Sequence, residues 1–231
     1  MRFYTLPPNG VNHPYLLVNR KNYRILFKRK FKHAIIDTGV MDFQNPKTRE
    51  YPKNFLKNWI KTARQLQRIF KGKTWIVIPD YPDDYHPGQF GDNVAKTLRN
   101  IKLFLNQAPD VNWLVSIQSR FLDRFSFFES CQRTREIVGD YPRIAIGTVC
   151  KCNKLDFIIY CCKVTRKIFP NSWVHAFGLT LKALPKVAHL IDSFDSMAWT
   201  FPRKSGGHSC RNVHERIKYF HAYMTRLKQL T

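Results

Sequence analysis

The sequence has no uninterrupted apolar run that approaches the roughly 20 residues of a membrane-spanning helix. Its first ten residues, MRFYTLPPNG, also lack the apolar core of a signal peptide. We therefore expect a cytoplasmic protein with no membrane partner.

Glycine and cysteine are both sparse and unpatterned. No G-x-G-x-x-G segment occurs among the 10 glycines, which argues against a dinucleotide-binding open sheet. The 6 cysteines show neither the paired spacing of a disulfide framework nor a four-ligand zinc pattern. A zinc site built from Cys150, Cys152, Cys161 and Cys162 stays an open alternative, although Cys162 falls on the apolar face of a helical pattern. We expect no cofactor and no bound metal.

Acidic residues are scarce as well. Only 16 Asp and Glu stand against 39 Lys and Arg, so the formal net charge is +23. A surface of this kind gains most from neutralising phosphates and releasing counterions, so nucleic acid is the favoured partner. The 231 residues are 44% hydrophobic, enough for one substantial core, and we expect a single domain over residues 1–231.

Short apolar runs alternate with helical patterns along most of the chain. The runs cover residues 34–37, 75–80, 113–118, 143–149, 173–178 and a strand that begins at 189 and gives way to a loop over 192–195. The helical patterns cover residues 55–70, 94–105, 122–138, 155–169, a short piece around Pro185, and 211–230. Such alternation predicts parallel βαβ units, in either an open sheet or a closed barrel. Without a dinucleotide-binding turn, a TIM-like (β/α)8 barrel is preferred.

The first 30 residues are less regular. Two apolar runs, at 15–18 and 23–27, stand among Pro, Asn and basic residues. They indicate N-terminal strands that form a hairpin or an edge, so the barrel is expected to be compact or irregular there.

Polar or glycine residues follow the predicted strands. In a barrel the C-terminal ends of all strands converge on one mouth. The residues that would meet there are Asp37, Asp80, Gln118, Gly147, Gly178 and Asp195. Asp195 alone would be an ordinary cap or turn residue, but its convergence with the others makes it the candidate reactive carboxylate.

These residue types suit a purine base. Asp80 and Gln118 can together read the amide edge of guanine, and Gly147 with Thr148 can add backbone groups. Phe177 and Met41 offer surfaces that can sandwich a base, although ordinary core packing explains both equally well.

At these positions the sequence resembles a family. Its stretches IIDTG, VIPD, VSIQS, IAIGTV, HAFGLT and SFDSMAWTFPR are similar to the ordered motifs of the tRNA-guanine transglycosylases. Those motifs are D-S-G-G, a strand-end Asp, a Gln, G-G-L, M-G-V-G and F-D-x-x-x-P-[TS]-R. The resemblance covers residues 34–203. It implies that Asp195 is the nucleophile and Asp37 the general acid/base of a base exchange. The residues that it assigns to base binding are Asp80, Gln118, Gly147, Thr148, Met41, Phe177 and Gly178.

The chain departs from the family pattern in several places. Val40, Asp42 and Thr148 replace two glycines and a Gln, which implies a reshaped base pocket. The family places a Cys-rich zinc subdomain after the nucleophile, whereas the single cysteine after Asp195 in this sequence is Cys210, with His208 and His214 near it. The chain is therefore more similar to the DNA 7-deazaguanine transglycosylases. This implies DNA as the substrate, a 7-deazaguanine base as co-substrate, and helper proteins for opening DNA. A tRNA-acting enzyme and a catalytically inactive nucleic-acid-binding barrel stay as alternatives.

The C-terminal segment 211–230 predicts a basic helix. Val213, Ile217, Phe220 and Met224 form one apolar stripe. The basic residues expected to contact nucleic acid are Arg203, Lys204, Arg216, Lys218, Arg226 and Lys228. The alternative is a helix that closes the barrel and has a solvated outer face.

Overall fold

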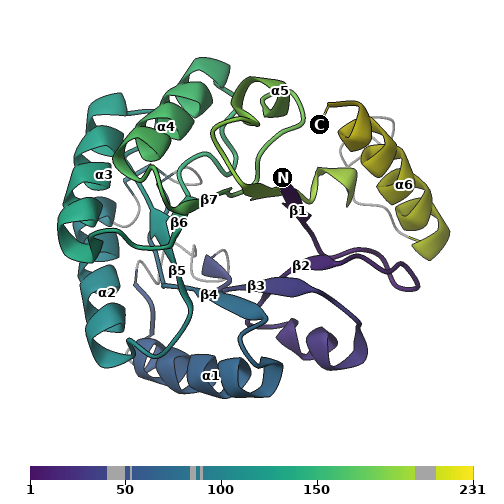
Figure 1. The fold of residues 1–231 in the computed structure, drawn as a ribbon, viewed down its shortest axis with the longest axis horizontal. Helices are drawn as coiled ribbons and strands as arrows, with labels where there is room; N and C mark the ends of the chain where they lie inside the picture. The colour runs from purple at the N-terminus through teal and green to yellow at the C-terminus, as the bar shows by residue number, and fades with distance from the viewer. Residues whose placement is uncertain (41–49, 53, 84–86, 89–90, 201–211, 231) are drawn as a thin grey trace.

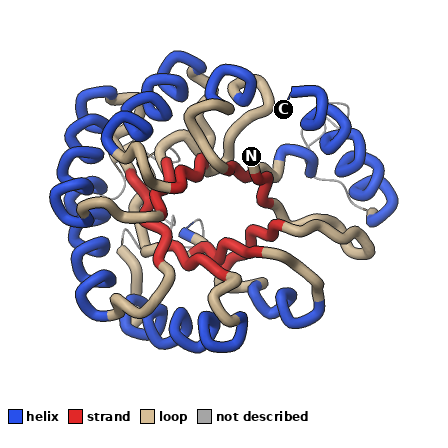
Figure 2. Tube along the Cα trace, in the orientation of Figure 1, coloured by secondary structure: helices blue, strands red, loops and turns tan. Residues whose placement is uncertain are grey.

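Eight parallel strands form a ring at the centre of the molecule (Figures 1 and 2). The computed structural model describes residues 1–231 except 41–49, 53, 84–86, 89–90, 201–211 and 231. The strands are β1 (Arg2–Tyr4), β2 (Tyr15–Asn19), β3 (His33–Asp37), β4 (Thr74–Val77), β5 (Trp113–Ile117), β6 (Arg143–Ile146), β7 (Trp173–Ala176) and β8 (Ser193–Asp195). Neighbours pair in the order β1-β8-β7-β6-β5-β4-β3-β2, which confirms the TIM-like barrel.

The ring is nearly closed by a short contact between β1 and β2. Thr5 bridges Leu16 in parallel, and the Leu17 N–H donates to the Thr5 carbonyl at 3.1 Å. The runs at 15–18 and 23–27 do not form a hairpin. The first run is the barrel strand β2, and the second forms the 3₁₀ helix η1 (Tyr23–Lys28).

Helices surround the ring where the sequence shows apolar periodicity. They are α1 (Phe55–Phe70), α2 (Asn93–Gln107), α3 (Arg124–Val138), α4 (Leu155–Ile168), the short α5 (Leu184–Val187) and α6 (Val213–Leu230). On α1, for example, Trp59, Ala63 and Leu66 recur at helical spacing and are buried against the sheet. No α-helix of the described residues lies between β1 and β2 or between β2 and β3, so the barrel is irregular at the N-terminus, as expected.

The apolar core has two layers. One lies between strands and helices, and a smaller one fills the ring itself. The buried members of the inner layer are Tyr4, Ile35, Val77, Leu114 and Ala145. Each comes from a different strand, and each points inward because side chains alternate across a strand. The ring is therefore packed, and its open end for chemistry is the mouth where the strands end.

Strand β8 is shorter and later than expected. Leu190 and Ile191 lie outside the strand, which begins at Ser193 and includes Asp195. The Leu190 carbonyl accepts from Arg166 Nε at 3.0 Å, so this apolar pair belongs to the connection from α5. Asp195 is thus the last strand residue rather than part of a loop.

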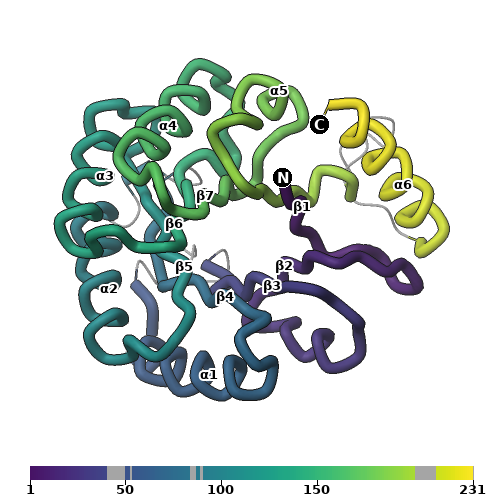
Figure 3. Tube along the Cα trace, in the orientation of Figure 1, coloured from purple at the N-terminus to yellow at the C-terminus, as the bar shows by residue number. Residues whose placement is uncertain are grey.

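Helix α6 packs beside the N-terminal strand, as Figure 3 shows for the yellow and purple ends of the chain. Its buried side chains are Phe220, Tyr223 and Leu227. Phe220 meets Trp199, and Tyr223 meets Phe3, through ring contacts of 5.4 and 5.5 Å. The apolar stripe predicted for this helix is wrong at its first residue, because the Val213 side chain is 47% exposed. Among the described residues, no helix has the length and apolar character to cross a membrane.

Candidate active site

Asp195 ends β8 at the barrel mouth and is held by two donors on one oxygen. The Gly178 N–H donates to Asp195 Oδ1 at 3.0 Å, and His175 Nε2 lies 3.2 Å from the same atom. The residue is only 8% exposed. Asp195 is therefore a buried carboxylate with a defined orientation.

The glycine at position 178 is required by its surroundings. Its φ of 59° lies in the left-handed region. A Cβ there would come within 2.7 Å of Cys150 Sγ and 2.9 Å of Cys150 Cα. Any other residue would push the β7 exit away from Asp195 and weaken the bond from its N–H.

A chain of buried polar groups supports His175 from inside the barrel. Trp173 Nε1 donates to Ser193 Oγ at 2.8 Å, and Ser193 Oγ lies 2.9 Å from His175 Nδ1. Ser193 is fully buried and its oxygen already accepts from Trp173, so its hydroxyl hydrogen is best placed on Nδ1. That arrangement assigns the ring proton to Nε2, which then donates to Asp195.

Asp37, at the end of β3, is the second carboxyl group of the mouth. Burial, reinforced by the nearby charge of Asp80, raises its pKa to about 7. Asp195 also raises this pKa, whereas the Gly39 N–H, 3.2 Å from Asp37 Oδ2, lowers it. A carboxyl group with this pKa can give or take a proton near neutral pH, which is the property that general acid–base chemistry uses.

Asp80 and Gln118 form a buried pair beside these carboxyl groups. Gln118 Nε2 donates to Asp80 Oδ2 at 2.6 Å. Burial raises the pKa of Asp80, and the bond from Gln118 opposes that rise. Within the described part of the chain, Gln118 Oε1 is buried without a hydrogen-bond partner. An unpaired buried acceptor is costly, so this atom suits a ligand that brings an N–H.

Gly147 makes room for that pair. A methyl group at this position would overlap with Gln118 Nε2 and lie 2.5 Å from Ser116 Oγ. The Gly147 N–H donates to the Ile117 carbonyl at 3.0 Å, so the sheet uses this donor. Thr148 is buried beside it, and its hydroxyl lies 2.8 Å from Ser119 Oγ. At this site the glycine therefore acts through its small size.

Phe177 directly follows β7 and is half-buried. Its ring meets the His175 ring edge-on at 4.7 Å and packs on the inner apolar layer. The other expected stacking residue, Met41, lies outside the described residues, as do Arg203 and Lys204. Phe177 thus packs against the residue that orients Asp195.

Tyr51 is a site residue that the sequence analysis missed. Its hydroxyl donates to the Asp80 carbonyl at 3.0 Å and lies 3.2 Å from Thr38 Oγ1. It therefore ties the exit of β3 to the exit of β4, which carry Asp37 and Asp80. No motif marks Tyr51, because it lies in a connection between elements.

The basic residues of α6 differ in exposure. Lys218, Arg226 and Lys228 are exposed, whereas Arg216 is half-buried and its guanidinium lies 5.6 Å from the Trp199 ring centre. Arg216 therefore contributes to packing, whereas the other three basic side chains face solvent.

The cysteine thiols are mostly buried. Burial raises the pKa of Cys162 to about 12 and the pKa of Cys161 well above its usual value. Within the described ranges, no group of three or more His, Cys, Asp or Glu is arranged to hold a metal ion. Buried thiols that stay protonated are poor ligands and poor nucleophiles.

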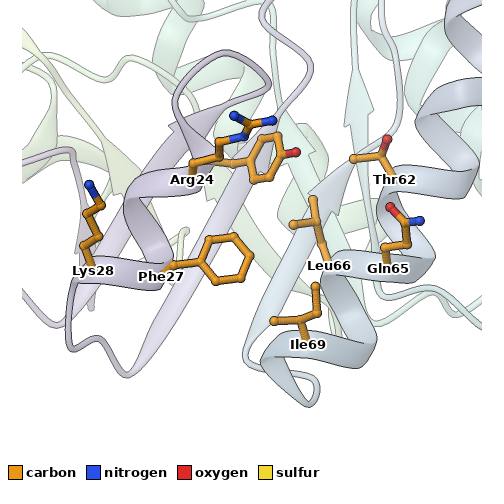
Figure 4. A pocket seen from close by; sticks show the side chains of 8 residues that line it. Arg24, Phe27, Lys28, Thr62, Gln65, Leu66 and Ile69 are labelled. Atoms are coloured by element: carbon orange, nitrogen blue, oxygen red, sulfur yellow. The ribbon is translucent and has the colours of Figure 1, made fainter.

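A groove of about 360 Å³ lies on the outer wall between η1 and α1 (Figure 4). Phe27 faces Leu66 and Ile69 across it. None of the candidate catalytic residues lines this groove, so it is separate from the mouth.

No family model and no curated protein matches this chain. Among solved structures, the chain is similar to active domain 2 of chitinase from Pyrococcus furiosus, in crystal structures of catalytic site mutants. The identity is 12% and the TM-score 0.40, over 93% of this chain and 97% of that chain.

Proposed function

We propose that this protein is a transglycosylase that exchanges guanine in DNA for a 7-deazaguanine base through a covalent bond between the sugar and Asp195. The observation that carries the proposal is the mouth itself, where an oriented buried carboxylate lies near a carboxyl group whose pKa is about 7. A protein that only binds phosphates gains nothing from buried carboxylates.

Asp195 is the nucleophile in this proposal. Both donors engage Oδ1, so we assign the attack on C1′ of a flipped-out deoxyguanosine to Oδ2. The bond from C1′ to the guanine nitrogen breaks as the bond from C1′ to Asp195 forms. Two displacements at one carbon retain the configuration of the sugar.

Asp37 moves the proton in both steps. In its protonated form it gives a proton to the departing guanine, and the resulting carboxylate then takes the ring N–H proton of the incoming base. That base displaces Asp195 from C1′ and regenerates the carboxylate. A pKa of about 7 fits both duties at neutral pH.

Asp80 and Gln118 select the base. Asp80 and the unpartnered Gln118 Oε1 present acceptors to the ring N–H and amino group on the amide edge of guanine. The same edge occurs in 7-deazaguanines, so one pocket serves the leaving and the incoming base. Chemistry of this type requires no metal or redox cofactor.

The net charge of +23 favours a nucleic-acid substrate, and the choice of DNA over tRNA rests on the resemblance to the DNA-modifying branch. The test is release of radiolabelled guanine from single-stranded DNA, duplex DNA and tRNA in the presence of 7-deazaguanine bases. We expect release from DNA. Release from tRNA alone would move the substrate to tRNA, and tight binding with no release from any substrate would indicate the inactive barrel.

A further inference from the structure

Three phenylalanines are exposed around the N-terminus of α3. Phe121 is 43% exposed, Phe125 76% and Phe128 38%. Large aromatic side chains gathered on a surface mark interaction sites more often than chance placement. We call this cluster, together with Arg120 and Arg124, the α3 platform.

The α3 platform lies at the rim of the mouth. Phe121 follows Gln118 by three residues, directly after β5. Its N–H donates to Asp83 Oδ2 at 2.8 Å, and Asp83 Oδ1 accepts from the Gly88 N–H at 2.6 Å. The loops after β4 and β5 are thus joined just outside the base-binding pair.

The backbone of the α3 platform is well anchored. The Arg120 N–H donates to Ser126 Oγ at 3.0 Å, and Asp123 caps the helix by accepting from the Ser126 N–H at 2.9 Å. Leu122 adopts a left-handed conformation with φ of 57°. The turn therefore presents Phe121 and Phe125 on a rigid base.

Charge at the α3 platform favours a polyanion. Arg120 and Arg124 are exposed, and the Arg124 guanidinium lies 5.3 Å from the Tyr160 ring centre. The adjacent loop after β6 adds exposed Lys151 and Lys154. Acidic side chains nearby are engaged or lie apart. Asp83 is buried and accepts from the Phe121 and Gly88 N–H groups, Asp123 caps the helix, and Glu129 pairs with Arg133 at 3.6 Å, while Asp156 is exposed on α4.

We propose that the α3 platform binds unpaired nucleotides that flank the nucleotide in the mouth. Bases stack on the exposed phenylalanine rings, and phosphates lie against Arg120 and Arg124. Stacking explains why aromatic rings and cations alternate here, where a surface that binds only phosphate would need the cations alone. This inference rests on the proposed function. The α3 platform would hold open the strand from which the base is flipped into the mouth.

The test measures binding rather than catalysis. The probes are short single-stranded DNA and RNA oligomers that carry one 2-aminopurine, whose fluorescence falls when it stacks. The double variant Phe121→Ala/Phe125→Ala should lose this quenching and bind about tenfold or more weakly. The slope of its binding constant against salt concentration, both as logarithms, should stay unchanged, since its cations still neutralise the same phosphates.

The variant Arg120→Gln/Arg124→Gln tests the cations. It should lower that slope by about 0.7 for each phosphate of a single strand that is no longer neutralised.

Phe27→Ala is the matched control, because Phe27 is also exposed, at 56%, but lines the outer groove away from the mouth. It should bind like the parent. An oligomer with abasic sites should bind the parent weakly, and the DNA and RNA arms identify which strand the α3 platform prefers.

Equal binding and quenching by the parent and the phenylalanine double variant would overturn the inference, as would capture of a protein at the α3 platform with no nucleic acid bound. These outcomes are independent of base exchange. Platform-dependent quenching without guanine release would retain the inference and reject the proposed function. Guanine release by the parent, with unchanged binding in the phenylalanine double variant, would support the proposed function and reject the inference about the α3 platform.

Discussion

His175 Nε2 lies 3.2 Å from Asp195 Oδ1, deep in the barrel and below the mouth. The ring is fully buried, and its other nitrogen contacts Ser193. In the proposed reaction, His175 is therefore a positioning residue that acts only through Asp195. A hydrogen bond to a charged group contributes about 1.5 to 3 kcal/mol, enough to matter for the orientation of a nucleophile.

Replacing His175 should separate rate from binding. We expect His175→Phe to lower kcat by about tenfold to a hundredfold, because one of the two donors on Asp195 Oδ1 is removed. KM for the nucleic acid should change little, since His175 does not reach the surface. Single-turnover guanine release gives the rate, and His175→Asn, which keeps a donor, should recover part of it. If kcat fell in step with the free energy of unfolding in both variants, and His175→Asn recovered no rate, His175 would have a purely structural role.

Asp37 should give the reaction its pH dependence. The first step needs protonated Asp37, so the single-turnover release of guanine should fall as pH rises through about 7. Asp37→Asn should slow base exchange by about 10² to 10⁴ fold and remove this dependence. A variant that keeps the parental pH profile would reject the assignment.

The same substitution should stabilise the fold above neutral pH. The folded-state pKa of Asp37 is raised, so the native state binds more protons than the unfolded state between pH 4 and about 7, and parental stability falls as pH rises through that window. Asp37→Asn removes the penalty. We expect Tm at pH 8 to rise by about 2 to 4 °C for each kcal/mol recovered, with little change at pH 4. Thermal unfolding followed by circular dichroism at both pH values measures this.

Gly147→Ala should damage the site through Gln118. The added methyl group overlaps with Gln118 Nε2, so either the strand or the glutamine must shift, at a cost of about 1 to 3 kcal/mol. The double variant Gly147→Ala/Gln118→Ala removes the overlap with Gln118 but keeps the close approach to Ser116 Oγ, so it should be more stable than Gly147→Ala alone but less stable than Gln118→Ala. Both should lose guanine selectivity. Denaturant unfolding of the single and double variants measures the coupling, and additive effects would contradict the steric role.

The exposed basic residues of α6 should contribute to binding without contributing to stability. We expect Lys218→Gln/Arg226→Gln/Lys228→Gln to flatten the salt dependence of nucleic-acid binding by about 0.7 to 0.9 for each phosphate left without its cation. Arg216→Gln is different, because it removes the guanidinium from the Trp199 ring and should cost about 0.5 to 1 kcal/mol of stability. Titrations at several salt concentrations decide the first point. An unchanged slope would remove α6 from the binding surface.

The strand-end residues could be predicted from the sequence because apolar runs stop at polar groups. Asp37, Asp80 and Gln118 follow such runs, and a barrel brings strand ends together whatever their separation in sequence. The link between Asp80 and Gln118 is the direct result. Asp195 was placed at the mouth on the same grounds, although its strand begins later than the apolar residues suggest.

His175 was missed because its position inside WVHAFG looks like strand interior. Its signal was the alternation of Trp173 and His175, which places both on one face of β7. Only the closed ring shows that this face points toward Ser193 and Asp195. The parallel N-terminal strands were missed for a related reason. Strand propensity does not reveal direction, and β1 pairs with β8, near the other end of the chain, as the register of Phe3 with Phe194 shows.

The most direct measurement is the mass of the protein after incubation with single-stranded DNA and acid quenching. We expect a covalent adduct on the parent, located by peptide mapping to the segment that carries Asp195. Asp195→Asn should bind DNA with parental affinity and show no adduct, since the amide has a similar shape but does not act as a nucleophile. Release of guanine by Asp195→Asn at the parental rate, or an adduct on another residue, would contradict the assignment.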